Sequence, residues 1–203
     1  MLPWITIAVV AHERLLHLPI IIHSFLVQTD PNWEMVILHD GPNDAHANLV
    51  APYTAQYPNI RYGQSSKRHN DFGHSLREWA LNEWVRTEWV CLTNDDNYYM
   101  PTFLKECNTV IANNTSAEFI MVDAVMNIPV QNSNRFNAYQ TQYTYPKVSH
   151  IDMGSFIGKT KALQDLGLNN KTAYSDGIMV EELIKSQPNA QAFKVNQTLF
   201  VHN

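Results

Sequence analysis

Residues 89–97 read Trp-Val-Cys-Leu-Thr-Asn-Asp-Asp-Asn, and no other stretch says as much about the fold. Its first part, Trp89–Leu92, is the short apolar run of a buried strand, and the acidic pair Asp95 and Asp96 follows closely. Acidic residues at the carboxyl end of a strand lie where open α/β sheets bind their ligands. The stretch therefore predicts a ligand site at one edge of an α/β sheet.

The chain before residue 89 alternates short β-branched runs with helical patterns, which is typical of βαβ units and a mostly parallel sheet. We expect strands at 5–10, 35–38 and 60–62, and helices at 14–28, 44–57 and 74–86. After residue 97 we expect a helix behind Pro101 and strands at 119–125 and 155–157. The polar stretch 131–145, which contains several tyrosines, is expected to be a long loop.

The composition favours one domain that does not bind nucleic acid. The 203 residues, 45% of them hydrophobic, suffice for a single substantial core. A net charge of -5 argues against a protein that neutralises many nucleic-acid phosphates. An anionic ligand would instead need a few placed basic groups, helix N-termini or a divalent cation.

The cysteines and the N-terminus point to a cytoplasmic protein. Cys91 and Cys107 form no C-x-x-C pair, so neither a disulfide framework nor a zinc site is predicted. The chain starts without a basic leader or a cleavage site, and no apolar run approaches the ~20 residues of a membrane span. We therefore expect a soluble protein without a transmembrane segment, whose oligomeric state the sequence leaves open.

Motifs of several other enzyme classes are absent. The chain has no G-x-G, no P-loop and no G-x-S-x-G, so it lacks the dinucleotide fingerprint and the hydrolase elbow. His12 and Glu13 begin a sequence that is similar to the H-E-x-x-H of zinc peptidases, but the second histidine is His17. That spacing turns the two imidazoles about 140° apart on a helix, which excludes the metalloprotease.

The surviving motifs, taken in order, resemble family 2-type glycosyltransferases of the GT-A fold from Ile5 to His202. The motifs of the first half are Ile7–Arg14, Ser24–Thr29, Glu34–Pro42, Asn70–Arg77 and Asn94-Asp95-Asp96 with Tyr99-Met-Pro101. In the second half, Met153–Lys161 resembles the strand and turn that pass the donor sugar and acceptor. Tyr174–Glu182 resembles the acidic motif that begins a helix in the family.

The resemblance implies a Rossmann-like, three-layer α/β/α sandwich with a mostly parallel central sheet. It implies one GT-A domain over residues 1–203, with a nucleotide-binding half at 1–100 and an acceptor and catalytic half at 101–203. The expected partners are a nucleotide-sugar donor and a saccharide or other hydroxyl acceptor, without nucleic acid.

The resemblance also assigns a divalent cation, Mn²⁺ or Mg²⁺, to Asp96, and the ribose or the metal shell to Asp95. The charge of a nucleotide diphosphate grows as the glycosidic bond breaks, and a bridging cation would act there as a Lewis acid. The family's first acidic position is Asn94 here, which lowers the charge of the site. The alternative is that the acidic pair forms an Asx-turn or caps the helix after Pro101.

Nucleotide-binding roles are implied for residues near the first strands. Asp40 matches the acid that accepts a hydrogen bond from the uracil imide, and the alternative is a turn residue before Gly41. Arg77 would neutralise phosphate or contact the base. Histidine replaces the tyrosine that is common at position 12. The first β-to-α turn, with which relatives line the base, contains Ala11, His12 and Glu13.

Asp176 is the expected catalytic base. An inverting transfer needs a carboxylate that takes the acceptor hydroxyl's proton as the oxygen attacks the anomeric carbon. Ser175 precedes Asp176 where the family often has Glu, and helix capping is the alternative role of Asp176. His202 resembles the late histidine that completes the metal site in some GT-A enzymes, and the alternative is an exposed, inert histidine near the chain end.

The sequence thus predicts an inverting, metal-dependent transfer of a hexosyl or N-acetylhexosaminyl group from a nucleotide diphosphate sugar, most simply a UDP sugar. One alternative is a nucleotide-sugar-binding module without turnover. Another is a nucleotidyltransferase, which would be expected to carry a Gly-rich basic first loop that Ala11–Arg14 does not provide. The sugar, the acceptor and the linkage do not follow from the fold.

Overall fold

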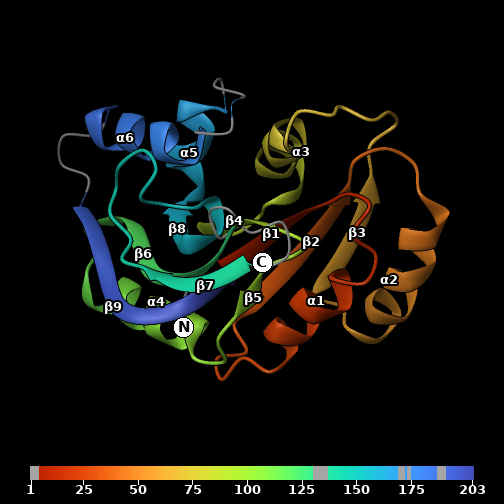
Figure 1. Cartoon of the computed structure of the whole chain (residues 1–203), viewed down its shortest axis with the longest axis horizontal. Coiled ribbons are helices and arrows are strands. Elements are labelled where there is room, and N and C mark those ends of the chain that lie inside the picture. The colour runs from red at the N-terminus through yellow and green to blue at the C-terminus, as the bar shows by residue number, and fades with distance from the viewer. Residues whose placement is uncertain (1–4, 130–136, 169–171, 173–174, 187–190) are drawn as a thin grey trace.

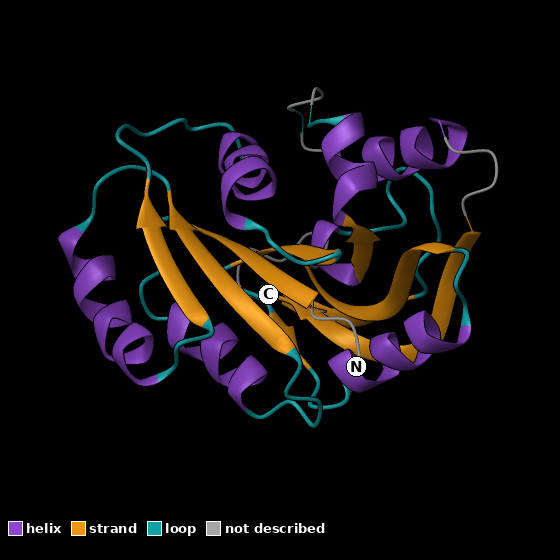
Figure 2. Ribbon diagram, turned by 180° about the vertical axis from the view of Figure 1, so that it is seen from behind, coloured by secondary structure: helices purple, strands orange, loops and turns teal. Residues whose placement is uncertain are grey.

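The computed structural model describes residues 5–129, 137–168, 172, 175–186 and 191–203. A twisted sheet runs through the molecule with helices on both faces (Figures 1 and 2). The strands are β1 (Ile5–Ala11), β2 (Trp33–His39), β3 (Ile60–Gln64), β4 (Trp89–Asn94), β5 (Tyr98–Tyr99), β6 (Ala117–Pro129), β7 (Asn137–Gln142), β8 (Phe156–Lys159) and β9 (Gln191–His202). The helices are α1 (Leu18–Leu26), α2 (Asp44–Gln56), α3 (His74–Trp79), α4 (Phe103–Asn113), α5 (Thr160–Leu166) and α6 (Ser175–Ser186), with a π-helix η1 (Ala80–Trp84) and a 3₁₀-helix η2 (Met153–Ser155).

The strand order is β3-β2-β1-β4-β8-β6-β9-β5, with β7 paired to β6. The first four strands of this order are parallel to one another, with Ile5 of β1 opposite Trp33 of β2 and Trp89 of β4. The β6–β9 pairing is also parallel, whereas β8, β5 and β7 pair antiparallel. The predicted α/β/α sandwich with a mostly parallel sheet is confirmed.

Helices cover both faces of the sheet, which explains why its inner strands are apolar throughout. In β1, Ile5, Ile7 and Val9 join one core cluster with α1, α2 and α4. Ala8 and Val10 join the other cluster, with α3, η1, α5 and α6. Figure 1 shows the same division, with α1, α2 and α4 below the sheet and α3, α5 and α6 above it.

The second half of the sheet departs from the prediction. The predicted loop over 131–145 is wrong for residues 137–142, which form β7, while residues 130–136 lie outside the described part of the chain. β7 pairs only with β6 among the described strands, so its side chains need not alternate between apolar and polar. The strand β9 was not predicted either, because it is largely half-buried or exposed and its register against β6 is irregular.

Two predicted helices have different bounds in the structure. The helix expected at 14–28 begins at Leu18, and Pro19 lies in its first turn, where a missing N–H is harmless. The helix expected at 74–86 is α3 continued by η1, with Trp79 and Trp84 in edge-to-face contact across the junction. None of the helices that the structure describes combines the length and apolar character that crossing a bilayer requires.

Candidate functional site

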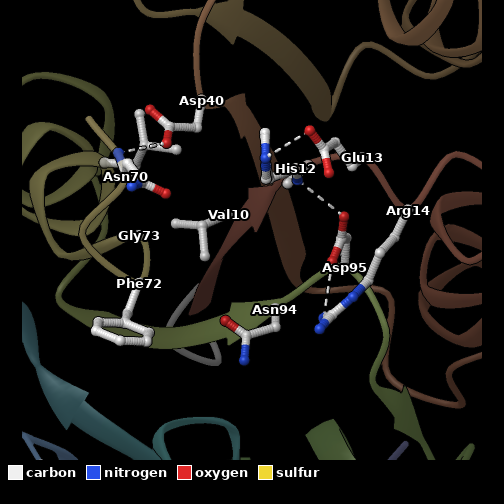
Figure 3. A pocket seen from close by; sticks show the side chains of 12 residues that line it. Val10, His12, Glu13, Arg14, Asp40, Asn70, Phe72, Gly73, Asn94 and Asp95 are labelled. Carbon is white, nitrogen blue, oxygen red and sulfur yellow. Dashed lines mark hydrogen bonds and ion pairs between the residues drawn. The ribbon is translucent and has the colours of Figure 1, made fainter. Parts of the chain in front are cut away.

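A pocket of about 490 Å³ lies at the carboxyl ends of β1, β2 and β4, next to the start of α3 (Figure 3). This is the sheet edge at which the strand-end carboxylates predicted a ligand site. Its volume falls in the range of small-molecule pockets, about 300–1,000 Å³. The residues that line it are Val10, Ala11, His12, Glu13, Arg14, Asp40, Asn70, Phe72, Gly73, Leu76, Asn94 and Asp95.

The end of β1 brings two of the predicted carboxylates to opposite sides of the pocket. The N–H of Asp95 donates to the carbonyl of Val10 at 3.1 Å, and the N–H of Asp40 donates to the carbonyl of Ala11 at 3.0 Å. Both bonds extend the parallel ladders by one step beyond the strands, because β2 and β4 flank β1. Asp40 and Asp95 are therefore fixed by the sheet itself.

The carboxylate of Asp95 is held by the turn that follows β1. Its Oδ2 accepts a 3.1 Å hydrogen bond from the backbone N–H of His12, and its Oδ1 lies 3.6 Å from Nη1 of Arg14. Asp95 is 2% exposed, and this burial raises the pKa of its carboxyl to about 7. A cation that approaches this carboxyl would favour its ionised form.

Among the carboxylates of this region, Asp96 is the one best suited to bind a metal ion. Its Oδ2 accepts a hydrogen bond from Nη1 of Arg14, whereas its buried Oδ1 has no hydrogen-bond partner in the described part of the chain. A buried oxygen without a partner is costly, and carboxylate oxygens are the ligands that Mg²⁺ and Mn²⁺ prefer. Thr102 stands at the N-cap position of α4, so Asp96 does not cap that helix.

The surroundings of Asp96 suit a cation that also binds the donor. Among the described residues, no three His, Cys, Asp or Glu side chains are grouped so as to hold a metal ion. A cation at Asp96 would therefore take most of its other ligands from phosphate oxygens and water, as Mg²⁺ usually does in nucleotide sites. The unpartnered Oδ1 fits that kind of site.

Asp40 lines the pocket and also anchors the neighbouring loop. Its two carboxylate oxygens accept hydrogen bonds from the backbone N–H groups of His69, at 2.8 Å, and Asn70, at 3.0 Å. Each oxygen can accept a second bond, so a ligand donor can still reach this carboxylate. The predicted contact with a base imide is compatible with this geometry and stays a prediction.

Three histidines, His12, His39 and His46, form a row of tilted ring contacts at the turn that follows β1. The ring centroids of His12 and His39 are 5.9 Å apart, and those of His39 and His46 are 4.2 Å apart. Burial lowers the pKa of His39, and burial together with His39 and His12 lowers the pKa of His46 to about 4. The ring of His12 therefore packs on the uncharged imidazole of His39 at neutral pH, and Oε1 of Glu13 lies 3.2 Å from its Nε2.

Arg77 supports the pocket wall from behind. It is 3% exposed, and its Nη1 donates to the carbonyl of Phe72 at 2.8 Å while its Nη2 donates to Oδ1 of Asn94. Burial lowers the pKa of Arg77, and the carboxylates of Asp176 and Asp152 oppose this change. Arg77 therefore fixes two residues of the pocket wall and lies within electrostatic range of Asp176, and its predicted contact with phosphate or base stays a prediction.

Asp176 lies in the first turn of α6 and faces η2. Its Oδ2 accepts a 3.0 Å hydrogen bond from the backbone N–H of Met153. Burial raises the pKa of Asp176, the nearby Asp152 raises it further, and Arg77 opposes the increase. The structure thus places beside η2 a buried carboxyl that retains its proton more strongly than usual and that lies within electrostatic range of Arg77.

His202 lies on the last strand and beside Asp152. The pairing of Tyr98 with Val201 puts the next residue, His202, near the turn that contains Asp96. Its Nδ1 is 3.5 Å from Oδ2 of Asp152, and its side chain is 28% exposed. His202 is therefore partly buried in a strand, although its role as a metal ligand stays a prediction.

Three residues of this region were not predicted as site residues: Arg14, Phe72 and Asp152. Arg14 and Phe72 both belong to the motifs that carry the family resemblance, so their position in the chain could have indicated them. Asp152 directly precedes Met153, but its proximity to His202 depends on the long-range pairing of β9. No local sequence signal indicates that contact.

A pocket at the ends of parallel strands, lined by the carboxylates of Asp40 and Asp95 and flanked by helices, defines a ligand-binding α/β protein of the doubly covered, three-layer class. The chain belongs to glycosyl transferase family 2, because the sequence model of that family matches residues 6–167. None of the curated protein sequences matches the chain significantly.

Solved structures of glycosyltransferases share the fold at low sequence identity. The crystal structure of S. aureus TarS 1-349 in complex with UDP has a TM-score of 0.74 and 17% identity, and the alignment covers 97% of this chain and 59% of that chain. The complex of the same TarS fragment with UDP-GlcNAc has a TM-score of 0.74 and 16% identity, with 97% and 57% covered. The mannosyltransferase PcManGT from Pyrobaculum calidifontis, in complex with GDP-Man and Mn2+, has a TM-score of 0.71 and 12% identity, with 99% and 57% covered.

The chain therefore spans less than two thirds of these solved proteins. The GT-A fold that the sequence resemblance implied is confirmed by them. At this level of identity they share the fold with this chain, while substrates have to be argued from the site.

Proposed function

We propose that this protein transfers a sugar from a nucleotide diphosphate sugar to a hydroxyl acceptor, with inversion at the anomeric carbon and with a divalent cation bound through Asp96. The observation that carries the proposal is the pair Asp95 and Asp96 at the end of β4, beside a 490 Å³ pocket with Asp40 at its opposite side. The membership in glycosyl transferase family 2 supports the reaction class.

The donor nucleotide would lie along the pocket from Asp40 to Asp95. Asp40 would accept a hydrogen bond from the base, which favours a uracil with its imide N–H, and TarS with bound UDP supports this choice. The turn Ala11–Glu13 would line the base, and Asp95 would bind the ribose or the metal shell. The diphosphate would then extend past Asp95 to Asp96, the next residue of the chain.

The cation, Mn²⁺ or Mg²⁺, would be held by Asp96, with His202 as the candidate second protein ligand. When bound, such an ion stabilises the negative charge that develops on the diphosphate leaving group. Arg14 has a 51% exposed side chain, so it can turn away from Asp96 when the cation and the phosphates arrive. The complex of PcManGT with GDP-Man and Mn2+ supports a manganese ion in this fold.

Asp176 would be the catalytic base. In this step the acceptor oxygen forms a bond to the anomeric carbon, its proton passes to a carboxylate oxygen of Asp176, and the bond to the diphosphate breaks with its electron pair. The hydrogen bond from Met153 fixes one oxygen of Asp176, which leaves the other for the acceptor. Its raised pKa strengthens it as a base, because it binds the transferred proton more tightly.

Turnover with a panel of UDP sugars and GDP-mannose, with Mn2+ and hydroxyl acceptors or water, tests this proposal through the released nucleotide. We expect one donor to be consumed, and we expect Asp176→Asn to lower the rate by about 10²–10⁴-fold while nucleotide binding persists. Binding of a nucleotide without consumption of any donor would favour the alternative, a binding module without turnover. Equal rates for the variant and the wild type would remove Asp176 from the mechanism.

A further inference from the structure

The loop between β3 and α3 has an unusual backbone. Asn70, Phe72 and Gly73 have φ angles of 55°, 58° and 80°, all in the left-handed region. Glycine adopts this region freely and asparagine tolerates it, but a bulky side chain such as Phe is disfavoured there because its Cβ crowds the backbone. The conformation of Phe72 is therefore one that the chain must enforce.

Fixed contacts on both sides enforce it. Asp40 accepts hydrogen bonds from the N–H groups of His69 and Asn70, at 2.8 and 3.0 Å, which fixes the start of the loop. The buried Arg77 donates to the carbonyl of Phe72 itself at 2.8 Å. Strain that a structure maintains in this way is typical of ligand-binding sites.

The close packing of the loop on β1 adds a further constraint. A Cβ atom at Gly73 would lie 2.8 Å from Cγ2 of Val10 and 3.3 Å from Nη1 of Arg77. The loop thus lies directly against the floor of the pocket, and only glycine fits between Phe72 and α3. The position of Phe72 relative to the pocket is accordingly well defined.

Burial of the ring does not explain this arrangement. Phe72 is 72% exposed, and its only ring contact among the described aromatic side chains is an edge contact with His74, at 6.5 Å between centroids. It nevertheless lines the pocket. Figure 3 shows Phe72 and His12 on opposite sides of the pocket with Val10 between them, so an occupant would lie between the two rings.

We propose that Phe72 is a ligand-contacting residue, whose ring forms the wall of the pocket opposite His12 and packs on the nucleoside of the donor. This inference rests on the proposed function. The strain of the loop then has a physical purpose, because it holds an apolar ring in solvent at the place where the ligand will cover it. The ring loses solvent contact only when the nucleotide binds.

Phe72→Asn tests this inference through two quantities that should change in opposite directions. Asparagine suits the left-handed backbone, so we expect the melting temperature of the ligand-free variant to rise by about 2–4 °C. The lost ring contact should weaken binding of UDP and of UMP by a similar factor of about tenfold, because the contact is with the nucleoside that both share. Titration calorimetry with Mn2+ and thermal unfolding supply the two quantities.

Three control variants separate the effect of the aromatic ring at position 72 from the effects of backbone strain and of an exposed ring elsewhere. Phe72→Tyr keeps the ring and should bind UDP within about threefold of the wild type. Ser149→Gly relieves another left-handed residue, φ 66°, that does not line the pocket, and should leave UDP affinity unchanged. Tyr143→Leu removes a 65% exposed ring elsewhere and should also leave it unchanged.

If Phe72→Asn binds UDP and UMP as tightly as the wild type does, the inference is overturned and the proposed function stays intact. A lower melting temperature of Phe72→Asn would overturn the account of the strained loop. If the wild type binds neither UDP, UMP nor GDP with Mn2+, the proposed function fails, and the role of Phe72 fails with it. A tenfold loss for UDP with none for UMP would also contradict a nucleoside contact.

Discussion

The guanidinium of Arg14 donates a hydrogen bond to Oδ2 of Asp96 and lies 3.6 Å from Oδ1 of Asp95. A positive group thus stands beside the carboxylate to which we assign a divalent cation. Because like charges repel, this guanidinium opposes a bare cation, whereas a donor that brings two phosphates supplies the Arg14 side chain with another partner. The arrangement predicts that cation and nucleotide bind together.

Arg14→Gln is therefore expected to bind Mn2+ in the absence of nucleotide about threefold to tenfold more tightly than the wild type, because a repelling charge is removed. The free Mn2+ signal in electron paramagnetic resonance measures this affinity. Arg68→Gln is the matched control, since the side chain of Arg68 is similarly exposed but pairs with Glu13, at 3.4 Å. Weaker Mn2+ binding by Arg14→Gln would show that Arg14 does not oppose the cation.

His46 predicts a pH dependence of stability. Burial lowers its pKa to about 4 in the folded protein, whereas an unfolded chain has an ordinary imidazole pKa of about 6.5. Between these values the unfolded state binds a proton that the folded state does not bind, so the free energy of unfolding falls as the pH falls from about 6.5 to about 4. Urea denaturation at several pH values measures this slope.

His46→Asn should reduce that slope, because the titrating group is gone. The slope should not vanish, since the pKa of His39 is also lowered by burial. The exposed His23 offers the control, and His23→Asn should retain the wild-type slope. An unchanged slope for His46→Asn would mean that other groups cause the acid sensitivity.

At Gly177, the first turn of α6 packs closely against the backbone of the loop that precedes η2. A Cβ atom at Gly177 would lie 2.3 Å from Cα and 2.8 Å from the backbone nitrogen of Val148, so the backbone would have to move. We expect Gly177→Ala to destabilise the protein by about 1–3 kcal/mol and to displace the turn that carries Asp176. Urea denaturation measures the loss of stability.

The control for this variant is Gly158→Ala. A Cβ atom at Gly158 meets only side-chain atoms of Leu163 as its nearest neighbours, at 3.0 Å and beyond, and a side chain can adjust. Its loss of stability should be clearly smaller than that of Gly177→Ala. Equal losses would indicate that the approach of Val148 to α6 is not a tight constraint.

The first half of the fold and the pocket could be predicted because their signals are local. A buried parallel strand is apolar along its whole length, and its polar end residues fall at the ligand edge of the sheet, so β4 indicated Asp95 and β2 indicated Asp40. These carboxylates and the turn Ala11–Glu13 do line or adjoin one pocket. The roles assigned to them by family resemblance remain proposals.

The second half could not be predicted in the same way. β7 and β9 are partly exposed and the register of β9 against β6 is irregular, so no alternation of apolar and polar residues marks them as strands. The contact between Asp152 and His202 joins residues far apart in sequence through the pairing of β9 with β5. The left-handed backbone of Phe72 follows from contacts with Asp40 and Arg77, which no local pattern specifies.

Calorimetric titration of UDP and of GDP, with and without Mn2+, into the wild type and Asp96→Asn probes the metal-dependent donor site itself. We expect that one nucleotide, UDP, binds the wild type only when Mn2+ is present, and that this binding is lost in Asp96→Asn. If the wild type binds neither nucleotide under any of these conditions, or if binding needs neither Mn2+ nor Asp96, the metal-dependent donor site is contradicted.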